Sequence, residues 1–119
     1  MHWEIDKTKP IAPQICERVS TLIALGEYRA GEKLPSVRET ALAAGVNPNT
    51  VQRSFEELER QGIIYSVRGS GWFVANQTNI AKEVLDSRII EKTAEYFEDM
   101  KNLGLSFSAI KKVIEEWEE

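Results

Sequence analysis

The sequence of 119 residues contains a single cysteine and a single histidine. With Cys16 alone, no disulfide can form within the chain, which fits a reducing compartment. Because His2 is the only histidine, there is no Cys/His cluster to hold a metal ion. No nucleophile can be paired with a suitably placed histidine base either. We therefore expect no metal, no cofactor and no enzymatic activity.

Long apolar runs are also missing. No run approaches the ~18 residues that a membrane-spanning helix needs. The first ten residues, "MHWEIDKTKP", carry charges where a signal peptide would need an apolar stretch. We expect a protein of the cytoplasm with no membrane partner.

The net charge of −4 is unevenly distributed. Residues 1–76 hold nine basic and nine acidic side chains, whereas residues 77–119 hold six and ten. The acidic excess therefore lies entirely in the last third of the chain. This change in charge predicts two parts, 1–76 and 77–119, with different roles.

Helix signals dominate the first part. Apolar residues at helical spacing predict a helix over 12–25. Ser36 followed by Glu39 is a capping box that starts a short helix over 36–44. A third helix is predicted over 47–61, where Asn47 suits the N-cap and proline the first helical position. Its buried stripe is expected to consist of Val51, Phe55 and Leu58. The last two helices and the short turn between them form a helix-turn-helix pattern.

Two β-rich runs, "IIYSV" and "WFV", flank a glycine-rich "RGSG" segment. This arrangement predicts a β-hairpin over 63–74. Gly69 and Gly71 supply positive φ angles or let the tip approach another surface closely. Three helices followed by a hairpin are the element order of a winged helix-turn-helix. Near the N-terminus, Trp3 and Ile5 form either a short strand or a packing contact on the first helix.

The last third is predicted to form two further helices, over 78–101 and 107–118. The apolar stripe of the longer helix is wider than one contact face requires. We expect these helices to build a homodimer, with little room left for a ligand cavity of ~300 Å3. The residues expected at the dimer interface are Val84, Leu85, Ile89, Ile90, Phe97, Phe107, Ile110, Ile114 and Trp117.

The start of the third helix is small and polar, with its apolar residues all on one side. Such a turn is free to enter a DNA major groove, and its unpaired amides suit phosphate. The alternative is a solvated first turn in an ordinary three-helix core. The hairpin favours DNA, because a glycine-rich tip beside Arg68 suits a wing lying along the backbone or minor groove.

Cys16 is interpreted as a small core residue, with a redox sensor as the alternative.

Several motifs together resemble the DNA-binding domain of GntR-family bacterial transcription regulators. They are "LPSVRE", "VNPNTVQRSFEELE", "QGII" and "RGSGWFV", and the resemblance covers residues 9–75. The short two-helix tail is similar to that of the YtrA subfamily. This resemblance implies a dimeric repressor, often linked to genes for membrane transporters.

The resemblance also implies residue roles. Arg38 matches a DNA-contacting arginine that often reads guanine; a salt bridge with Glu39 or Glu17 is the structural alternative. Ser36 and Thr50 match phosphate-contacting positions, and Gly69 matches the wing glycine. Two positions depart from the family pattern: Pro48 and Gln52 stand where many relatives have arginine. Asn49, which can pair with adenine, and Arg53 are the candidate replacements.

The predicted fold is therefore mainly α with a small β-hairpin (α+β), a winged helix-turn-helix followed by a two-helix dimerisation tail. We expect a repressor that binds a palindromic operator in double-stranded DNA; no effector is identified. The alternative is a winged-helix adaptor that binds a protein without binding DNA. The predicted DNA contacts are Lys33, Ser36, Arg38, Asn47, Asn49, Thr50, Gln52, Arg53, Arg68, Gly69 and Ser70.

Overall fold

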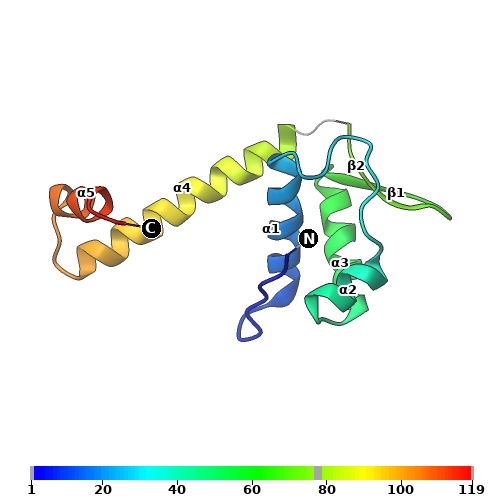
Figure 1. The fold of residues 1–119 in the computed structure, drawn as a ribbon, viewed down its shortest axis with the longest axis horizontal. Helices are drawn as coiled ribbons and strands as arrows, with labels where there is room; N and C mark the ends of the chain where they lie inside the picture. The colour runs from blue at the N-terminus through cyan, green and yellow to red at the C-terminus, as the bar shows by residue number, and fades with distance from the viewer. Residues whose placement is uncertain (1, 77–78, 119) are drawn as a thin grey trace. The chain divides into compact units, whose positions relative to one another are not determined.

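The computed structural model describes residues 2–76 and 79–118, and in these ranges it contains five helices and one hairpin (Figure 1). The fold is thus mainly helical α+β, as predicted. In chain order the elements are α1 (Ile11–Ala24), α2 (Val37–Ala44), α3 (Pro48–Arg60), β1 (Ile64–Val67), β2 (Gly71–Val74), α4 (Asn79–Asn102) and α5 (Phe107–Glu115).

The predicted helix over 107–118 is too long, because α5 ends at Glu115. The residues that follow include Glu116 and Glu118. Negative side chains are unfavourable at the C-terminal end of a helix, where the unsatisfied carbonyl groups already carry partial negative charge. The start predicted for α4, residue 78, lies outside the described residues.

The chain divides into two compact units inside α4, after Leu85. The sequence placed this division at residue 76, but the first turns of α4 pack on the core that precedes them. Ala81 is fully buried there, and Ile80 and Val84 contact the same cluster. The first unit therefore includes the start of α4, and the second unit runs from Asp86 through α5.

The core of the first unit joins α1, α2, α3, the hairpin and the start of α4. The predicted stripe of α3 is confirmed, since Val51, Phe55 and Leu58 are all buried. The ring of Phe55 meets that of Trp72 edge to face, with centroids 5.6 Å apart. This contact fixes the hairpin against α3. The other core residues are Ile15, Val19, Ile23, Leu34, Ala41, Ile63, Ile64, Val74 and Ala81.

Of the two predictions for the N-terminal segment, the packing contact is the one observed. Trp3 and Ile5 are half-buried against the core cluster. No strand is assigned to residues 2–6.

The second unit buries far less. Phe97 of α4 and Phe107 of α5 stack with ring centroids 5.3 Å apart. Ile110 is 0% exposed, so this residue packs inside the unit and is closed to a partner. Large apolar side chains remain exposed at Ile89, Ile90, Tyr96, Leu103, Phe107, Val113, Ile114 and Trp117. Among the described residues, no helix is long and apolar enough to cross a membrane.

Candidate nucleic-acid interface

The helix-turn-helix is built by local hydrogen bonds that the sequence predicted. The Ser36 Oγ accepts from the Glu39 amide at 3.0 Å, and the Glu39 carboxylate accepts from the Ser36 amide at 3.2 Å. At α3, the Asn47 Oδ1 accepts from the Asn49 amide at 2.8 Å. These bonds leave the Ser36 hydroxyl proton and the Asn47 NH2 group as the donors that either side chain can offer to DNA.

The first two turns of α3 present polar side chains to solvent. Asn49, Gln52 and Arg53 are exposed, and Thr50 is half-buried. No acidic residue lies in the first turn of the helix. The partial positive charge of the helix N-terminus is therefore not offset by a carboxylate there, which suits an approaching phosphate.

Arg38 of α2 is exposed. The carboxylate of Glu39 is engaged by the Ser36 amide, a bond that holds the pKa of Glu39 below its usual value. Within the part of the chain that the structure describes, Arg38 forms no ion pair with Glu39 or Glu17. Its guanidinium group therefore remains available for the guanine contact that the family resemblance implies.

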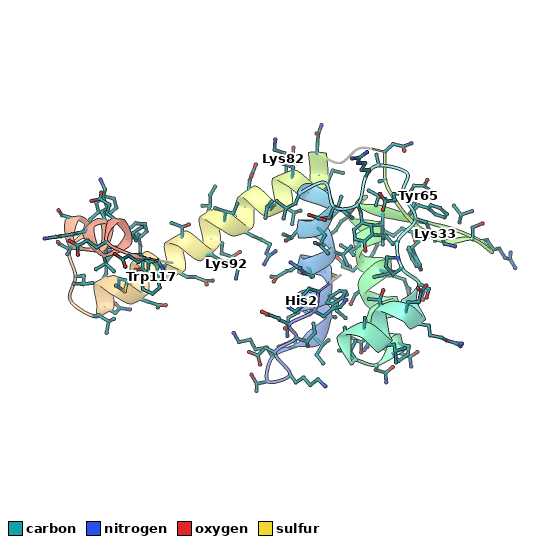
Figure 2. The ribbon with its side chains drawn as sticks, viewed as in Figure 1. His2, Lys33, Tyr65, Lys82, Lys92 and Trp117 are labelled. Carbon is teal, nitrogen blue, oxygen red and sulfur yellow. The ribbon has the colours of Figure 1, made fainter. Side chains whose placement is uncertain are left out.

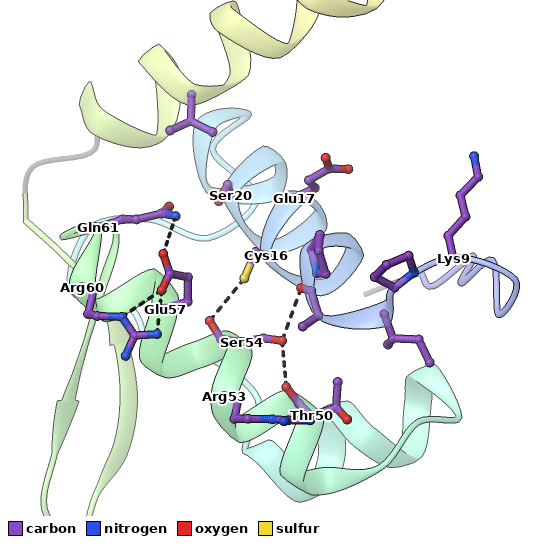
Figure 3. Close-up of a pocket in the computed structure, with 15 residues that line it drawn as sticks. Lys9, Cys16, Glu17, Ser20, Thr50, Arg53, Ser54, Glu57, Arg60 and Gln61 are labelled. Carbon is purple, nitrogen blue, oxygen red and sulfur yellow. Dashed lines mark hydrogen bonds and ion pairs between the residues drawn. The ribbon is translucent and has the colours of Figure 1, made fainter.

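The acidic residues of α3 lie in its second half, and two of them bond to protein partners. Glu57 Oε2 accepts from the Arg60 Nε at 2.8 Å, which lowers the pKa of Glu57 (Figure 3). Glu59 Oε2 accepts from both the amide and the hydroxyl of Ser66, at 2.8 and 2.9 Å. Glu59 thus ties the outer edge of β1 to α3 and positions the wing. Nothing in the sequence spacing indicated this contact.

The wing has three backbone segments at its base. β1 and β2 pair antiparallel with Ile64 opposite Val74 and Val67 opposite Gly71. Lys33 adds a bridge to Phe73. The Lys33 side chain lies over the hairpin, with its Cε 3.2 Å from where a Cβ on Gly71 would stand (Figure 2). The Lys33 side chain therefore packs closely against Gly71 and places its ammonium group at the wing.

The wing tip is an exposed turn formed by Arg68, Gly69 and Ser70. The Ser70 amide donates to the Val67 carbonyl at 2.9 Å. Gly69 has φ +80°, and a Cβ added there would meet no atom within 4 Å. The backbone conformation of the turn therefore favours glycine, while the space around it is open to a binding partner.

A groove of about 820 Å3 is lined by residues of α1 and α3, which pack against each other there (Figure 3). Cys16 lines it and donates from Sγ to the Ser54 carbonyl at 3.4 Å. Burial raises the pKa of the Cys16 thiol. This keeps it protonated, which suits the prediction of a packing residue better than that of a redox sensor. Thr50 and Arg53 line the same groove, so it opens beside the start of α3.

The described residues contain no group of three His, Cys, Asp or Glu side chains that could hold a metal ion. The predicted DNA-contacting residues all belong to the first unit, on α2, α3, the Lys33 segment and the hairpin. In Figure 1 the hairpin projects on the side of α3 away from α1.

Comparison with known proteins places these features in one group. The sequence model of the bacterial regulatory proteins of the gntR family matches residues 11–74. The chain is 40% identical over 106 residues to the uncharacterized HTH-type transcriptional regulator YhcF of Bacillus subtilis (strain 168), covering 89% of this chain and 88% of the relative. It is 35% identical to the HTH-type transcriptional repressor YtrA of the same organism, covering 90% and 83%.

Solved structures agree with the sequence comparisons. A GntR family transcriptional regulator from Listeria monocytogenes superposes with a TM-score of 0.85 at 36% identity, covering 96% of this chain and all of that one. The DNA-binding domain of AraR, solved in complex with operator ORE1, matches with a TM-score of 0.55 at 34% identity. That match covers 56% of this chain and 82% of the AraR chain.

Proposed function

The chain belongs to the GntR family of bacterial regulatory proteins and is a DNA-binding transcription regulator of that family, and we propose that it is a repressor that binds a palindromic operator as a homodimer. The observation that supports DNA binding is the polar, solvent-facing side of the first half of α3, which has no carboxylate in its first turn and follows the exposed Arg38 of α2. The relatives are named as transcription regulators, which argues against the adaptor alternative.

We assign base recognition to polar side chains of α2 and α3 that are exposed to solvent. A guanidinium fork at Arg38 pairs with O6 and N7 of guanine, and the amide of Asn49 pairs with adenine. Gln52 and Arg53 extend the reading face along α3. Pro48 removes the arginine that many relatives carry at that position. The operator of this chain is therefore expected to differ in sequence from theirs.

Backbone contacts are assigned to the edges of this reading face. Thr50 and the hydroxyl proton of Ser36 donate to phosphate, and the NH2 group of Asn47 does so at the start of α3. The wing supplies Lys33, Arg68 and Ser70, while Gly69 lets its tip lie close to the DNA. Such contacts hold the register and carry no sequence information.

Dimerisation is assigned to the second unit, because its apolar side chains are exposed in the single chain. Tyr96, Val113, Ile114 and Trp117 line a surface groove of about 370 Å3. The sequence had indicated little room for such a cavity. Burying these residues against a second copy would stabilise the pair at ~25 cal/mol per Å2 of apolar surface. Ile89, Ile90 and Phe107 are also exposed, and Phe97 is half-buried.

Two of the residues predicted for the interface lie at the end of the first unit. Val84 and Leu85 are half-buried, and Val84 packs on the core. We therefore place the main dimer contact after Leu85. A two-fold axis would set two recognition helices about 34–36 Å apart, one turn of DNA, and would call for a palindromic site. Genes for a membrane transporter are the proposed targets, from the resemblance to the YtrA subfamily.

Selection of bound duplexes from a random-sequence library tests the DNA half of the proposal. Enrichment of one palindromic motif is expected, with an affinity that falls steeply as salt rises, because bound phosphates release counterions. Recovery of no motif, or binding that is independent of salt, would refute it.

Sedimentation of the full chain and of residues 1–85 tests the dimer half. The cut is placed after Leu85, because a cut after Asn76 would also remove the buried Ala81. The full chain is expected to be dimeric at micromolar concentration and the fragment monomeric. A dimeric fragment or a monomeric full chain would contradict the assignment.

A further inference from the structure

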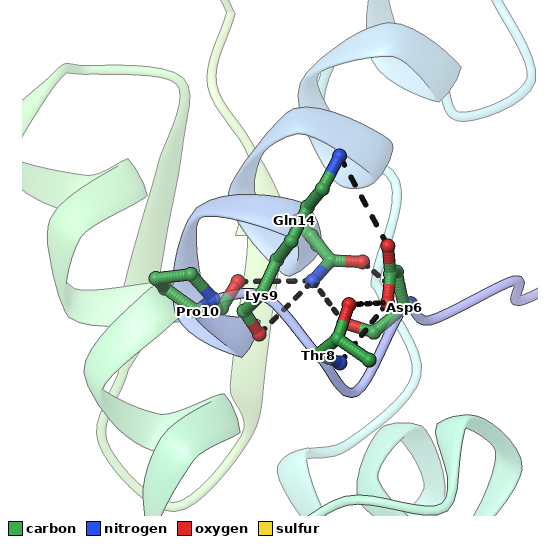
Figure 4. Close-up of polar contacts among 5 residues, drawn as sticks. All are labelled: Asp6, Thr8, Lys9, Pro10 and Gln14. Carbon is green, nitrogen blue, oxygen red and sulfur yellow. Dashed lines mark hydrogen bonds and ion pairs between the residues drawn. The ribbon is translucent and has the colours of Figure 1, made fainter.

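A loop of four residues, Asp6 to Lys9, precedes α1 and carries two lysines. The side chain of Gln14, one turn into α1, clamps this loop (Figure 4). Its Oε1 accepts from the Asp6 amide at 2.8 Å. Its Nε2 donates to the carbonyl groups of Asp6 at 2.8 Å and Pro10 at 2.9 Å. The loop backbone is therefore fixed by a rigid helix, although the loop itself is exposed.

Asp6 closes the loop from within. Its Oδ1 accepts from the amide of Thr8 at 3.0 Å and from the hydroxyl of Thr8 at 2.6 Å. The two hydrogen bonds hold the pKa of Asp6 below its usual value, so it is ionised at neutral pH. Its other oxygen lies 4.0 Å from the Nζ of Lys9. The single carboxylate of the loop is thus engaged inside the loop, and the loop keeps a net charge of +1.

The lysines lie beside the helix-turn-helix. The Nζ of Lys7 is 3.9 Å from the position that a Cβ on Gly45 would take, in the turn between α2 and α3. Lys9 lines the same groove as Thr50 and Arg53. The Lys7 ammonium therefore lies at the turn before α3, and Lys9 belongs to the same loop and lines the adjoining groove, although both lysines precede α3 by more than thirty residues.

We propose that the Asp6–Lys9 loop is a further contact to the DNA backbone, in which Lys7 and Lys9 bind phosphates on the edge of the DNA major groove that α3 enters. This inference rests on the proposed function. An ammonium group acts on phosphate as a point charge, so the contact adds affinity and no base preference. The loop precedes residues 11–74, the region that the family model matches. It would therefore add to the contacts of the helix-turn-helix and the wing.

The test is a salt titration of DNA affinity with the full chain. The probes are a duplex recovered from the random library by the wild-type chain and a scrambled duplex of the same length. Each lysine–phosphate contact contributes a slope of about −0.9 in the log–log salt dependence. The fold-loss of affinity between about 50 and 200 mM salt should therefore be about 12 times smaller for the double variant Lys7→Gln/Lys9→Gln than for wild type. For Lys7→Gln alone it should be about 3.5 times smaller. The ratio of affinities for the two duplexes should stay within about twofold.

Two variants serve as controls. Lys7→Arg/Lys9→Arg keeps both charges and should retain the wild-type slope. Arg29→Gln removes one positive charge from the turn that follows the C-terminal end of α1, whereas the loop precedes the N-terminal end of that helix. It should leave the slope near wild type.

The outcomes separate the loop from the proposed function. A double glutamine variant with the wild-type slope would overturn the loop contact, even if its affinity fell, because that fall would then reflect structure alone. If the wild-type chain itself recovered no motif and bound DNA without salt dependence, the proposed function would be overturned along with it.

Discussion

The two units of the chain differ in how far they bury their apolar side chains. In the first unit, residues from four helices and the hairpin form the core around Phe55, which is 1% exposed. In the second unit, α4 and α5 enclose Ile110 and leave Trp117 75% exposed. A closed core stabilises a unit by itself, whereas an exposed apolar face gains stability only when something covers it. The first unit thus encloses most of its large apolar side chains, although Leu25 and Leu42 are exposed, whereas the second unit leaves most of its own exposed.

The largest expected effect is on the core of the first unit. Phe55→Ala removes the ring at the centre of the cluster and its edge-to-face contact with Trp72. It should lower the free energy of unfolding by about 3–5 kcal/mol, measured by urea unfolding. The matched change Phe107→Ala in the second unit, where the residue is 63% exposed, should cost less than half as much at concentrations where the chain is monomeric. An equal loss in the free energy of unfolding for the two variants would contradict the stated difference in burial between the units.

Next in size is the effect of Trp117→Ala on assembly. If a second copy covers this side chain, truncation should weaken the dimer by about 2 kcal/mol or more, as buried tryptophans at interfaces do. Sedimentation over a range of concentrations measures the shift. Leu25→Ala is the control, because Leu25 is 63% exposed on the first unit. Equal dissociation constants for the two variants would leave the exposed face of the second unit without a role in dimerisation.

Arg38→Ala should reduce specific DNA binding by about 1–3 kcal/mol, because it removes a bidentate base contact. Binding to a scrambled duplex should change less. Competition titrations with both duplexes measure the difference, with Arg29→Ala as a charge-matched variant. Were Arg38→Ala to bind its selected duplex like wild type, the role implied by the family resemblance would be wrong.

A smaller effect is expected from a pair of glycines. Gly69 and Gly26 have φ +80° and +81°, and a Cβ on either would meet no atom within 4 Å. Alanine at either position should therefore cost a similar amount of stability, about 1–2 kcal/mol, from backbone strain alone. Only Gly69→Ala should also weaken DNA binding. Thermal melts and gel shifts of the two variants separate strain from contact, and equal loss of DNA affinity would make the wing tip a purely structural turn.

The smallest effect is the acid dependence of the α2 cap. Hydrogen bonds from Ser36 place the pKa of Glu39 in the folded chain below its ordinary value of 4.5. The resulting stabilisation is complete above that ordinary value, and it is lost as the pH falls through the lower folded value. Glu39→Gln keeps a capping side chain that does not titrate. Its melting temperature should therefore fall less between pH 5 and pH 3 (roughly the range in which carboxylates titrate) than that of wild type, and identical acid profiles would argue against the cap.

Local chemistry was readable from the sequence alone. The Ser36–Glu39 box, the Asn47 cap and the α3 stripe were all predicted correctly, because each depends on a spacing within one or two turns of helix. The hairpin was predicted for the same reason, since its turn residues lie between two β-rich runs.

Tertiary packing decided the rest. The boundary after Leu85 depends on Ala81 reaching a core made by residues far earlier in the chain. The hydrogen bonds of Glu59 with Ser66 and the approach of Lys7 to Gly45 likewise do not follow from any regular helix or strand spacing in the sequence. Such contacts arise only when helices have packed at particular angles, so residue order constrains them weakly. The sequence therefore determined the elements and their polar ends, and the packing of those elements decided which charges lie together beside α3.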